Sequence, residues 1–333
     1  MTTRRPVIVS CGEPAGVGPE VVAKAWAQLR GALPLVWVGD PAHLPPGTPF
    51  RIIADPSEAA GIAAEALPVL AHRFPAPATP GIPSPQNAAE VIAVIARAVA
   101  LVQAGAGLAV CTAPLHKGAL YAGAGFAFPG HTEFLAHLAG DVPVAMMLAS
   151  EHIDPPLRVV PTTIHIPLSE APRALTQALL ADTIEITRAA LIRDFGIADP
   201  RIAVAGLNPH AGEGGKMGRE EIDLIEPLVR RYQDMRWRIL GPVAADTLFH
   251  AAARRRYDAA ICMYHDQALI PIKTLDFAGG VNLTLGLPFV RTSPDHGTAF
   301  DIAGKGLADP ASMIAALEMA ARLGTRRATA RQS

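Results

Sequence analysis

Three histidines in this sequence each lie a few residues beyond a short apolar segment that has the composition of a buried strand. They are His165 after residues 158–160, His210 after residues 202–205 and His265 after residues 259–263. Ligands of open α/β sheets bind beyond the carboxyl ends of the strands, so the pattern predicts that these imidazoles share one edge of a sheet. Three protein ligands with an open position form the usual catalytic zinc site. The spacing matches no short metal motif, so a shared metal and three independent loop histidines both stay open.

Carboxylates accompany these histidines along the chain. Glu213 follows His210, Asp266 follows His265, and Asp246 lies between the two. A carboxylate that accepts a hydrogen bond from a metal-bound imidazole fixes its tautomer and orientation, which is one expected role. The alternative is that these are solvated loop carboxylates.

Two glycine-rich segments have the composition of ligand-binding loops. Residues 12–20 (GEPAGVGPE), with Gly12, Gly16 and Gly18, follow the first strand and open a helix, so they can present backbone N–H groups to a ligand. They do not match the G-x-G-x-x-G fingerprint, and a tight βα turn is the alternative. Residues 208–218 (NPHAGEGGKMG) indicate a second ligand loop or an ordinary mobile surface loop.

Several polar residues suit an anionic ligand. His131 and Thr132 stand at a helix start, where Thr132 is either the N-cap or a donor to an anion. Lys273, Asn282 and Arg291 lie at the edges of apolar segments, and Lys with Arg suits a phosphate or a carboxylate. Each of these residues taken singly also fits a surface position or a structural ion pair.

A third loop, residues 296–306 (HGTAFDIAGKG), has little bulk and one carboxylate, Asp301. An acid that accepts hydrogen bonds from both ribose hydroxyls selects NAD, because it would repel a 2′-phosphate. A simple helix entry is the alternative. His296 and Gly297 open this loop.

Composition narrows the class of protein. The chain has 333 residues, of which 50% are hydrophobic and 18% charged, and its net charge is -1. That composition predicts a packed globular protein without a nucleic-acid or membrane partner. The three scattered cysteines indicate free thiols in a reducing compartment. Residues 91–102 are too short and too interrupted for a membrane span, and no signal peptide is visible, so we expect a cytoplasmic protein.

Short β-branched runs alternate with longer helical patterns, which favours an α/β fold with mostly parallel sheets. The expected strands are residues 7–10, 35–38, 108–111, 144–148, 158–160, 202–205, 259–263, 281–284 and 289–291. The expected helices include residues 19–30, 87–102, 132–138, 181–195, 220–231, 247–255 and 310–323. Two lobes with a cleft between them are expected.

Taken together, these segments resemble the 4-hydroxythreonine-4-phosphate dehydrogenase family over nearly the whole chain. The matching stretches are residues 12–22, 112–118 (TAPLHKG), 130–134 (GHTEF), 206–217 (GLNPHAGEGGKM), 241–249 (GPVAADTLF), 263–267 (MYHDQ) and 281–306. The resemblance implies two α/β/α lobes with the fold of isopropylmalate dehydrogenase, and a homodimer. It implies a cofactor-binding lobe of residues 1–128 plus 279–333, and a metal, substrate and dimerisation lobe of residues 129–278.

The resemblance also assigns roles to residues. It implies that His165, His210 and His265 bind one divalent cation (Zn²⁺, Co²⁺ or Mg²⁺) at a site shared between subunits. The implied substrate ligands are His131, Thr132, Asp246, Lys273, Asn282 and Arg291, with Asp246 or Lys273 as the general base. The implied cofactor-binding residues are Gly12, Gly16, Gly18, His296, Gly297 and Asp301, with NAD expected and NADP left open. Asp309 replaces the asparagine that contacts adenine in the related decarboxylating dehydrogenases.

The resemblance implies oxidation of 4-phosphooxy-L-threonine to 2-oxo-3-amino-4-phosphooxybutanoate, which decarboxylates to 3-amino-1-hydroxyacetone 1-phosphate in vitamin B6 synthesis. A related dehydrogenase of phosphorylated threonate or erythronate, or of an aromatic dihydrodiol, is the first alternative. A zinc hydrolase is the second, since three histidines and an open site also activate water. A non-catalytic, metal-dependent binding protein is a third and remote alternative.

Overall fold

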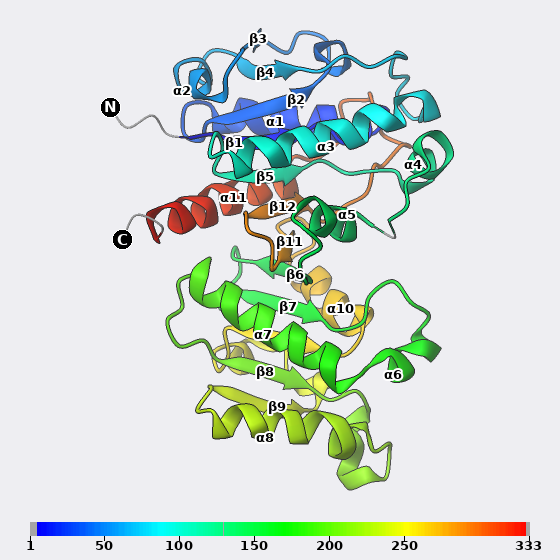
Figure 1. Ribbon diagram of the computed structural model, residues 1–333, viewed down its shortest axis with the longest axis vertical. Coiled ribbons are helices and arrows are strands. Elements are labelled where there is room, and N and C mark those ends of the chain that lie inside the picture. The colour runs from blue at the N-terminus through cyan, green and yellow to red at the C-terminus, as the bar shows by residue number, and fades with distance from the viewer. Residues whose placement is uncertain (1–4, 129, 331–333) are drawn as a thin grey trace. The chain divides into compact units, whose positions relative to one another are not determined.

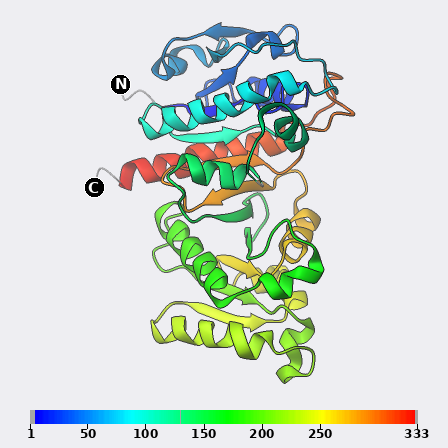
Figure 2. The same ribbon diagram turned by 45° about the vertical axis from the view of Figure 1, so that its right-hand side comes forward.

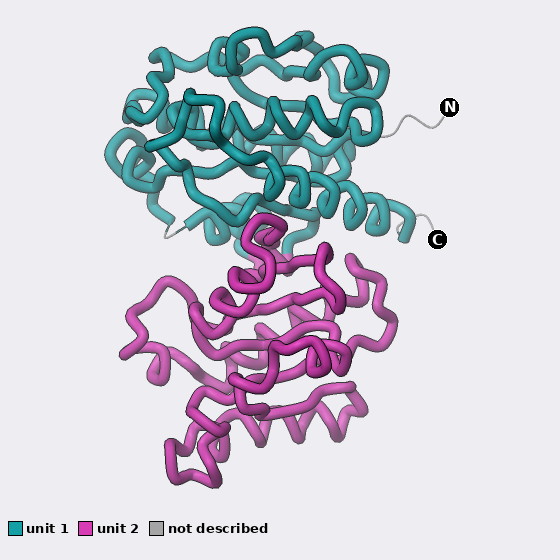
Figure 3. The backbone as a smooth tube through the Cα atoms, turned by 180° about the vertical axis from the view of Figure 1, so that it is seen from behind, with its two compact units in different colours: residues 1–141, 287–333 teal, residues 142–286 magenta. Residues whose placement is uncertain are grey.

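The computed structural model describes residues 5–128 and 130–330, which form two compact units. Unit 1 comprises Met1–Asp141 and Leu287–Ser333, and unit 2 comprises Val142–Gly286, as Figure 3 shows in teal and magenta. Both junctions fall further along the chain than the boundaries expected at residues 129 and 279. The helix that begins at His131 therefore belongs to unit 1, and the strand that carries Asn282 belongs to unit 2.

The sheet of unit 1 has six strands, all parallel to their neighbours, in the order β3-β4-β2-β1-β5-β12. Their bounds are β1 Val7–Ser10, β2 Leu35–Gly39, β3 Phe50–Ile52, β4 Leu67–Ala71, β5 Ala109–Thr112 and β12 Arg291–Pro294. The central strands β1, β2 and β5 are buried along their whole length. Continuous burial is what a parallel sheet covered by helices on both faces requires.

Helices on both faces close unit 1. They are α1 Gly18–Leu29, α2 Ala59–Ile62, α3 Ala88–Gln103, α4 Lys117–Ala124, α5 His131–Leu138 and α11 Ala311–Ala330. The chain moves one way from β1 to β2 and the other way from β4 to β5, so right-handed crossovers place α1 and α3 on opposite faces (Figures 1 and 2). The segment Pro85–Gln103 is long and apolar enough to cross a membrane, yet α3 packs on β1, β2 and β5 as a core helix.

The sheet of unit 2 has the strand order β11-β6-β7-β10-β8-β9. Its strands are β6 Ala145–Ser150, β7 Leu157–Pro161, β8 Ile202–Ala205, β9 Ile239–Val243, β10 Ala259–Cys262 and β11 Val281–Leu285. Only β6 runs against its neighbours β7 and β11; the pairs β7–β10, β10–β8 and β8–β9 are parallel. The predicted α/β class with mostly parallel sheets is therefore confirmed.

The helices of unit 2 are α6 Ala171–Ala174, α7 Gln177–Arg193, α8 Glu226–Asp234, α9 Ala251–Arg254 and α10 His265–Leu275. In Figure 1, α7 and α8 lie in front of the sheet and α10 behind it. A π-helical turn, Glu221–Ile225, precedes α8. The sequence did not indicate α10, because Pro271 lies inside it and removes one backbone donor.

Candidate active site

One edge of the unit 2 sheet collects most of the residues that the sequence singled out. The strands β7, β10, β8 and β9 are parallel, so their carboxyl ends share this edge. In that order, the strands are followed by His165, His265, His210 and Asp246. The predicted grouping of three histidines at strand ends is therefore present, and Asp246 lies beyond the next strand.

His165 and His265 are neighbours. Their ring centroids are 5.9 Å apart, with the planes tilted by 43°. Nδ1 of His265 lies 2.7 Å from Oδ1 of Asp266, and 37% of the His265 side chain is exposed. A carboxylate at Nδ1 holds the proton there and leaves Nε2 as a lone-pair donor, which is the arrangement that metal-binding histidines use.

Two buried side chains hold the three loops together. Thr163, just before His165, donates its hydroxyl to the carbonyl of Met263 at 2.8 Å. Gln267 accepts from the Met263 N–H at 2.7 Å and donates to the Gly206 carbonyl at 2.8 Å. The segments after β7, β10 and β8 are thus joined by direct hydrogen bonds, so the loops that carry the histidines form one structure.

The backbone of these loops is unusual. His165 (φ 55°) and His210 (φ 52°) both adopt the left-handed conformation that L-residues other than asparagine, aspartate and glycine rarely occupy. Ala211, Glu213 and Ala299, all in the predicted ligand loops, share it. Such strain gathers at functional sites, where the surrounding structure must enforce it.

The donors fit a divalent cation in part. His165 and His265 supply two adjacent imidazoles of the type that zinc, cobalt and nickel favour. Within residues 5–128 and 130–330 of one chain, no three His, Cys, Asp or Glu side chains gather closely enough to hold an ion. The shared site in which all three histidines meet therefore stays a prediction that requires a second subunit or a loop movement.

The other predicted ligands of unit 2 lie on neighbouring elements. Asp246 is exposed in the short helical segment Ala245–Thr247 after β9. Lys273 is in the last turn of α10, and its Nζ lies 5.1 Å from the centre of the Phe277 ring. Asn282 is half-buried on β11 opposite Leu148 of β6.

A buried cation lies beside the carboxyl end of β5 in unit 1. Arg291 begins β12 and is 4% exposed. Its Nε and one terminal nitrogen donate to Oγ1 of Thr112, the last residue of β5, at 3.2 and 2.7 Å. Burial lowers the pKa of Arg291 to about 10, so the guanidinium remains charged at neutral pH.

The same guanidinium fixes the state of His131. A terminal nitrogen of Arg291 lies 3.3 Å from Nδ1 of His131, and a guanidinium can only donate, so Nδ1 accepts. Burial, followed by the charges of Arg291 and Lys117, holds the pKa of His131 well below its usual value. The neutral ring then carries its proton on Nε2, which is shielded from solvent and has no acceptor among the described residues. His131 is therefore a buried donor suited to a ligand oxygen.

The interpretation of Thr132 as an N-cap is wrong. The N-cap of α5 is Gly130, whose extended backbone (φ -164°) lets the helix begin at His131, so Thr132 is in the first turn. The alternative role, donation to an anion at this helix end, stays a prediction.

The glycine-rich turn and the third loop pack on each other in unit 1. Gly12 has φ 69°, and a Cβ there would lie 2.5 Å from the Pro114 carbonyl oxygen. A Cβ on Gly16 would lie 2.9 Å from the Thr298 carbonyl oxygen, to which Val17 donates at 2.9 Å. Close backbone approach therefore explains these glycines, and Gly18 meets the Cys11 carbonyl in the same way.

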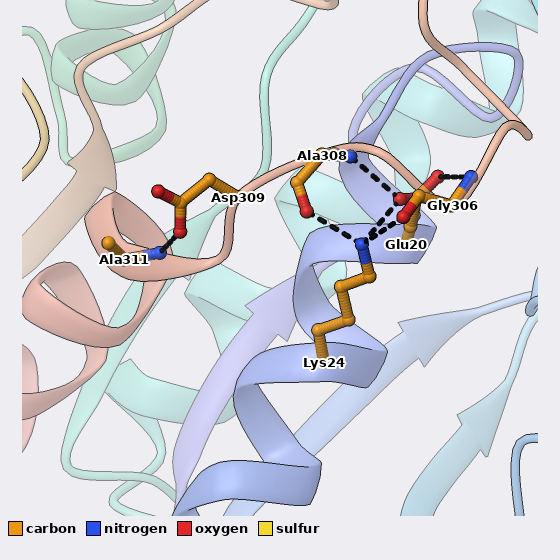
Figure 4. Close-up of polar contacts among 6 residues, drawn as sticks. All are labelled: Glu20, Lys24, Gly306, Ala308, Asp309 and Ala311. Carbon is orange, nitrogen blue, oxygen red and sulfur yellow. Dashed lines mark hydrogen bonds and ion pairs between the residues drawn. The ribbon is translucent and has the colours of Figure 1, made fainter.

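An ion pair on α1 fastens the far end of the third loop (Figure 4). Glu20 accepts from the N–H groups of Gly306 and Ala308 at 3.3 and 2.9 Å. Lys24 donates to both of their carbonyls, at 2.8 and 2.7 Å, and to Glu20 at 2.8 Å. Asp309 accepts from the Ala311 N–H at 2.9 Å at the start of α11. Asp309 therefore has a local capping role.

The remaining predicted cofactor residues lie in this loop. Nδ1 of His296 lies 2.9 Å from the carbonyl of Gly297, and Asp301 is exposed. A cavity of about 790 Å³ adjoins the far end, lined in part by Gly16, Lys24 and Lys305.

The sheet of unit 2 gathers imidazoles beyond its parallel strands, and unit 1 has a buried guanidinium and glycine-rich loops. These features are typical of the class of α/β enzymes that bind small anionic molecules beyond parallel strands. The comparisons are more specific. Residues 29–320 match the family described as Pyridoxal phosphate biosynthetic protein PdxA. A 4-hydroxythreonine-4-phosphate dehydrogenase of Paracoccus denitrificans is 63% identical over 98% of this chain and 100% of its own. This protein belongs to that family.

Solved structures agree with the family. A 4-hydroxythreonine-4-phosphate dehydrogenase from Klebsiella pneumoniae is 40% identical and superimposes with a TM-score of 0.87, covering 96% of this chain and 98% of its own. A terephthalate 1,2-cis-dihydrodiol dehydrogenase from Burkholderia xenovorans is 30% identical with a TM-score of 0.65, at the same coverage.

Sequence reasoning missed the residues that support the site. Thr112, Asn208 and Gln267 all lie inside the quoted motifs, yet none was singled out. Asn208 and Gln267 lie close in sequence to the candidate ligands His210 and His265, which was the available signal for them; Thr112 has no such neighbour. Glu221 lies outside every motif, and only its burial reveals it.

Proposed function

We propose that this protein catalyses the NAD-dependent oxidation of 4-phosphooxy-L-threonine in vitamin B6 biosynthesis. The observation that carries the proposal is the 63% identity, over essentially the full length of both chains, to a relative named 4-hydroxythreonine-4-phosphate dehydrogenase. The geometry of each unit supplies groups that the reaction needs, and their roles follow below.

The phosphate of the substrate is assigned to unit 1. Arg291 offers a permanent charge, and neutral His131 offers an N–H donor that lacks a protein acceptor among the described residues. A phosphate accepts hydrogen bonds from both kinds of donor, and burial strengthens them. Thr132 in the first turn of α5 adds a hydroxyl at a helix end that favours anions. Binding energy at this remote group orients the carbon that reacts.

The alcohol is assigned to unit 2. His165, His210 and His265 would hold a divalent cation, with Asp266 orienting His265. When bound, such a cation supplies Lewis-acid chemistry that lowers the pKa of the substrate hydroxyl. Asp246 or Lys273 takes the hydroxyl proton. Asn282 completes the proposed substrate contacts.

The oxidation moves a hydride from the carbon of the alcohol to the nicotinamide ring, which supplies the acceptor. Oxidation of the threonine hydroxyl at C3 gives 2-amino-3-oxo-4-phosphooxybutanoate, with the ketone at C3 and not at C2 as expected from the sequence. This product is a β-keto acid. Its bond to the carboxylate breaks, carbon dioxide leaves, and the resulting enolate takes up a proton on carbon to give 3-amino-1-hydroxyacetone 1-phosphate.

We assign the cofactor to the packed loops of unit 1. The turn with Gly12, Gly16 and Gly18 packs closely on neighbouring backbone, including that of Thr298 in the third loop. The loop from His296 and Gly297 to Asp301 is held in place at its far end by Glu20. Asp301 is proposed to accept from the ribose hydroxyls and so to favour NAD over NADP. We further propose a cytoplasmic homodimer in which the two subunits share each metal site.

The direct test follows NADH absorbance with purified protein and 4-phosphooxy-L-threonine, with and without a chelator. Turnover that the chelator removes and zinc, cobalt or magnesium restores is the expected result. Phosphothreonate and an aromatic cis-dihydrodiol serve as matched substrates, since the dihydrodiol dehydrogenase shares 30% identity. Faster turnover of either one than of 4-phosphooxy-L-threonine would overturn the assignment of substrate, and turnover unaffected by chelation would overturn the role of the metal.

A further inference from the structure

A buried carboxylate lies under the loop that carries His210. Glu221 is 1% exposed and opens the π-helical turn Glu221–Ile225. Its Oε1 accepts from the backbone N–H of Asn208 at 2.8 Å, and its Oε2 accepts from the side-chain amide of Asn208 at 3.0 Å. Glu220 accepts from the same amide at 2.8 Å. Buried carboxylates are costly unless they are hydrogen-bonded, so this contact is a specific feature of the fold.

Residues 210–214 of this loop have a left-handed backbone conformation, which L-amino acids other than glycine rarely adopt. His210, Ala211, Gly212, Glu213 and Gly214 all have positive φ, at 52°, 50°, 78°, 42° and 64°. Each residue other than glycine in this conformation costs about 1–2 kcal/mol. Three such residues in one run form only if the surrounding structure favours the run strongly.

The loop packs closely on Glu221 and on Asn208, its hydrogen-bond partner. A Cβ on Gly212 would lie 2.6 Å from Oε2 of Glu221, and one on Gly206 would lie 3.1 Å from Oε1. A Cβ on Gly218 would lie 2.3 Å from the side-chain nitrogen of Asn208. The loop thus approaches the Glu221 carboxylate at Gly206 and Gly212, and its end at Gly218 closes on the side chain of Asn208.

We propose that Glu221, acting through Asn208, is a positioning residue that holds the His210 loop in its left-handed winding and so presents His210 to the cation. π-Helical turns recur at functional sites, because the extra residue aims a side chain that a regular helix would turn away. Gln267 holds the start of the same loop through the Gly206 carbonyl, and Glu221 holds Asn208, which precedes Pro209 and His210. The inference rests on the proposed role of His210 as a ligand.

The substitution Glu221→Gln tests it, since the amide keeps the size but presents N–H groups to the donor side chain of Asn208. The control is Asp223→Asn in the same turn, which removes the exposed partner of Arg219. The first measurement is amide hydrogen exchange across residues 206–218 of the metal-free protein. Glu221→Gln is expected to raise exchange there by about tenfold or more, with residues 158–165 unchanged. Asp223→Asn is expected to leave both segments as in the wild type.

The second measurement is the dissociation constant for Co²⁺, from its visible absorption in competition with a chelator. Loss of a residue that orients a ligand costs 10- to 100-fold in metal affinity, so an increase of about that size is expected for Glu221→Gln. If Glu221→Gln does not fold, Asn208→Ala replaces it, because this change removes the side-chain bonds and keeps the backbone bond to Glu221.

The outcomes distinguish a failure of the proposed metal-binding function from a failure of the positioning role of Glu221. Wild-type protein that binds no Co²⁺ would sink the proposed metal function, while the exchange data would still report on the loop. Normal Co²⁺ affinity and normal exchange in a folded variant at Glu221 or Asn208 would overturn the positioning role. A fall in urea stability with unchanged Co²⁺ affinity would show a merely structural carboxylate, which also contradicts the proposal.

Discussion

The substitution Arg291→Lys tests most directly how the protein recognises the phosphate of the substrate. Arg291 uses two nitrogens on Oγ1 of Thr112, at 3.2 and 2.7 Å, and one of them also lies 3.3 Å from His131. Lysine keeps the charge but has a single nitrogen, so it cannot reproduce the planar fork. The guanidinium is 4% exposed, and water therefore does not replace the lost bonds.

The magnitude follows from the bonds that are lost. A hydrogen bond with a charged partner contributes about 1.5–3 kcal/mol. Lysine offers one nitrogen to the phosphate where the guanidinium can offer two, so the loss of one charged hydrogen bond should weaken transition-state binding by up to about 3 kcal/mol, or roughly 150-fold in kcat/KM. In this variant His131 also loses the donor that fixes its tautomer. That loss should further weaken binding of the phosphorylated substrate and not of the unphosphorylated one.

The assay compares 4-phosphooxy-L-threonine with unphosphorylated 4-hydroxythreonine in each variant. Arg291→Lys should lower kcat/KM for the phosphorylated substrate by that factor and leave the weak activity on the other substrate nearly unchanged. The matched control is Arg327→Lys, another buried arginine of unit 1, which donates to the Leu287 carbonyl at 3.0 Å. This control should cost stability in urea without changing the preference between substrates.

An equal loss on both substrates would refute the reasoning, because it would mean that Arg291 supports the fold rather than the phosphate. Unfolding midpoints in urea for the two lysine variants separate that case from a loss of binding.

Three further predictions concern the other assigned residues. His210→Ala should abolish metal-dependent turnover while circular dichroism stays native, and full activity in metal-free buffer would contradict the assignment. Asp301→Ala should weaken NAD binding measured by calorimetry by about tenfold and leave metal content unchanged, since one charge-assisted ribose contact is lost; an unchanged affinity would remove that role. His131→Asn should weaken the pH dependence of stability. Burial depresses the pKa of His131, so below its usual value of about 6.5 the unfolded chain binds a proton that the native state does not bind. The stability of the wild type therefore falls as the pH drops. Urea unfolding at pH 7 and pH 5 measures this, and equal losses in the wild type and the variant would exclude His131 as the source.

Much of the fold follows from local pattern. The apolar runs of β1, β8 and β10 and the helices α1 and α3 occur within a few residues of where the sequence indicated them, and α11 begins where expected but continues to Ala330. Strong apolar periodicity explains that success, since it needs no distant partner. Weakly patterned elements were missed: β3 is exposed, and β9 contains Gly241 and Pro242.

The strand β12 shows where local pattern misleads. The apolar residues Phe289 and Val290 indicated a strand at residues 289–291, but the strand is Arg291–Pro294. Its sequence, RTSP, is polar and nevertheless fully buried beside β5. Polar residues buried along a whole strand contradict the usual pattern, and such exceptions are expected at functional or strained sites, which propensity cannot anticipate.

The sequence by itself determined the class of fold, the family, and the set of chemical groups: which residues are imidazoles, carboxylates and cations, and that several follow strands. Tertiary structure alone decided which of these groups touch. Parallel pairing of β7, β10 and β8 brings His165 and His265 within 5.9 Å across a hundred residues of chain. It also decided the protonation of His131 and the burial of Glu221, because both depend on desolvation and on neighbours distant in sequence, quantities that no local window of residues contains.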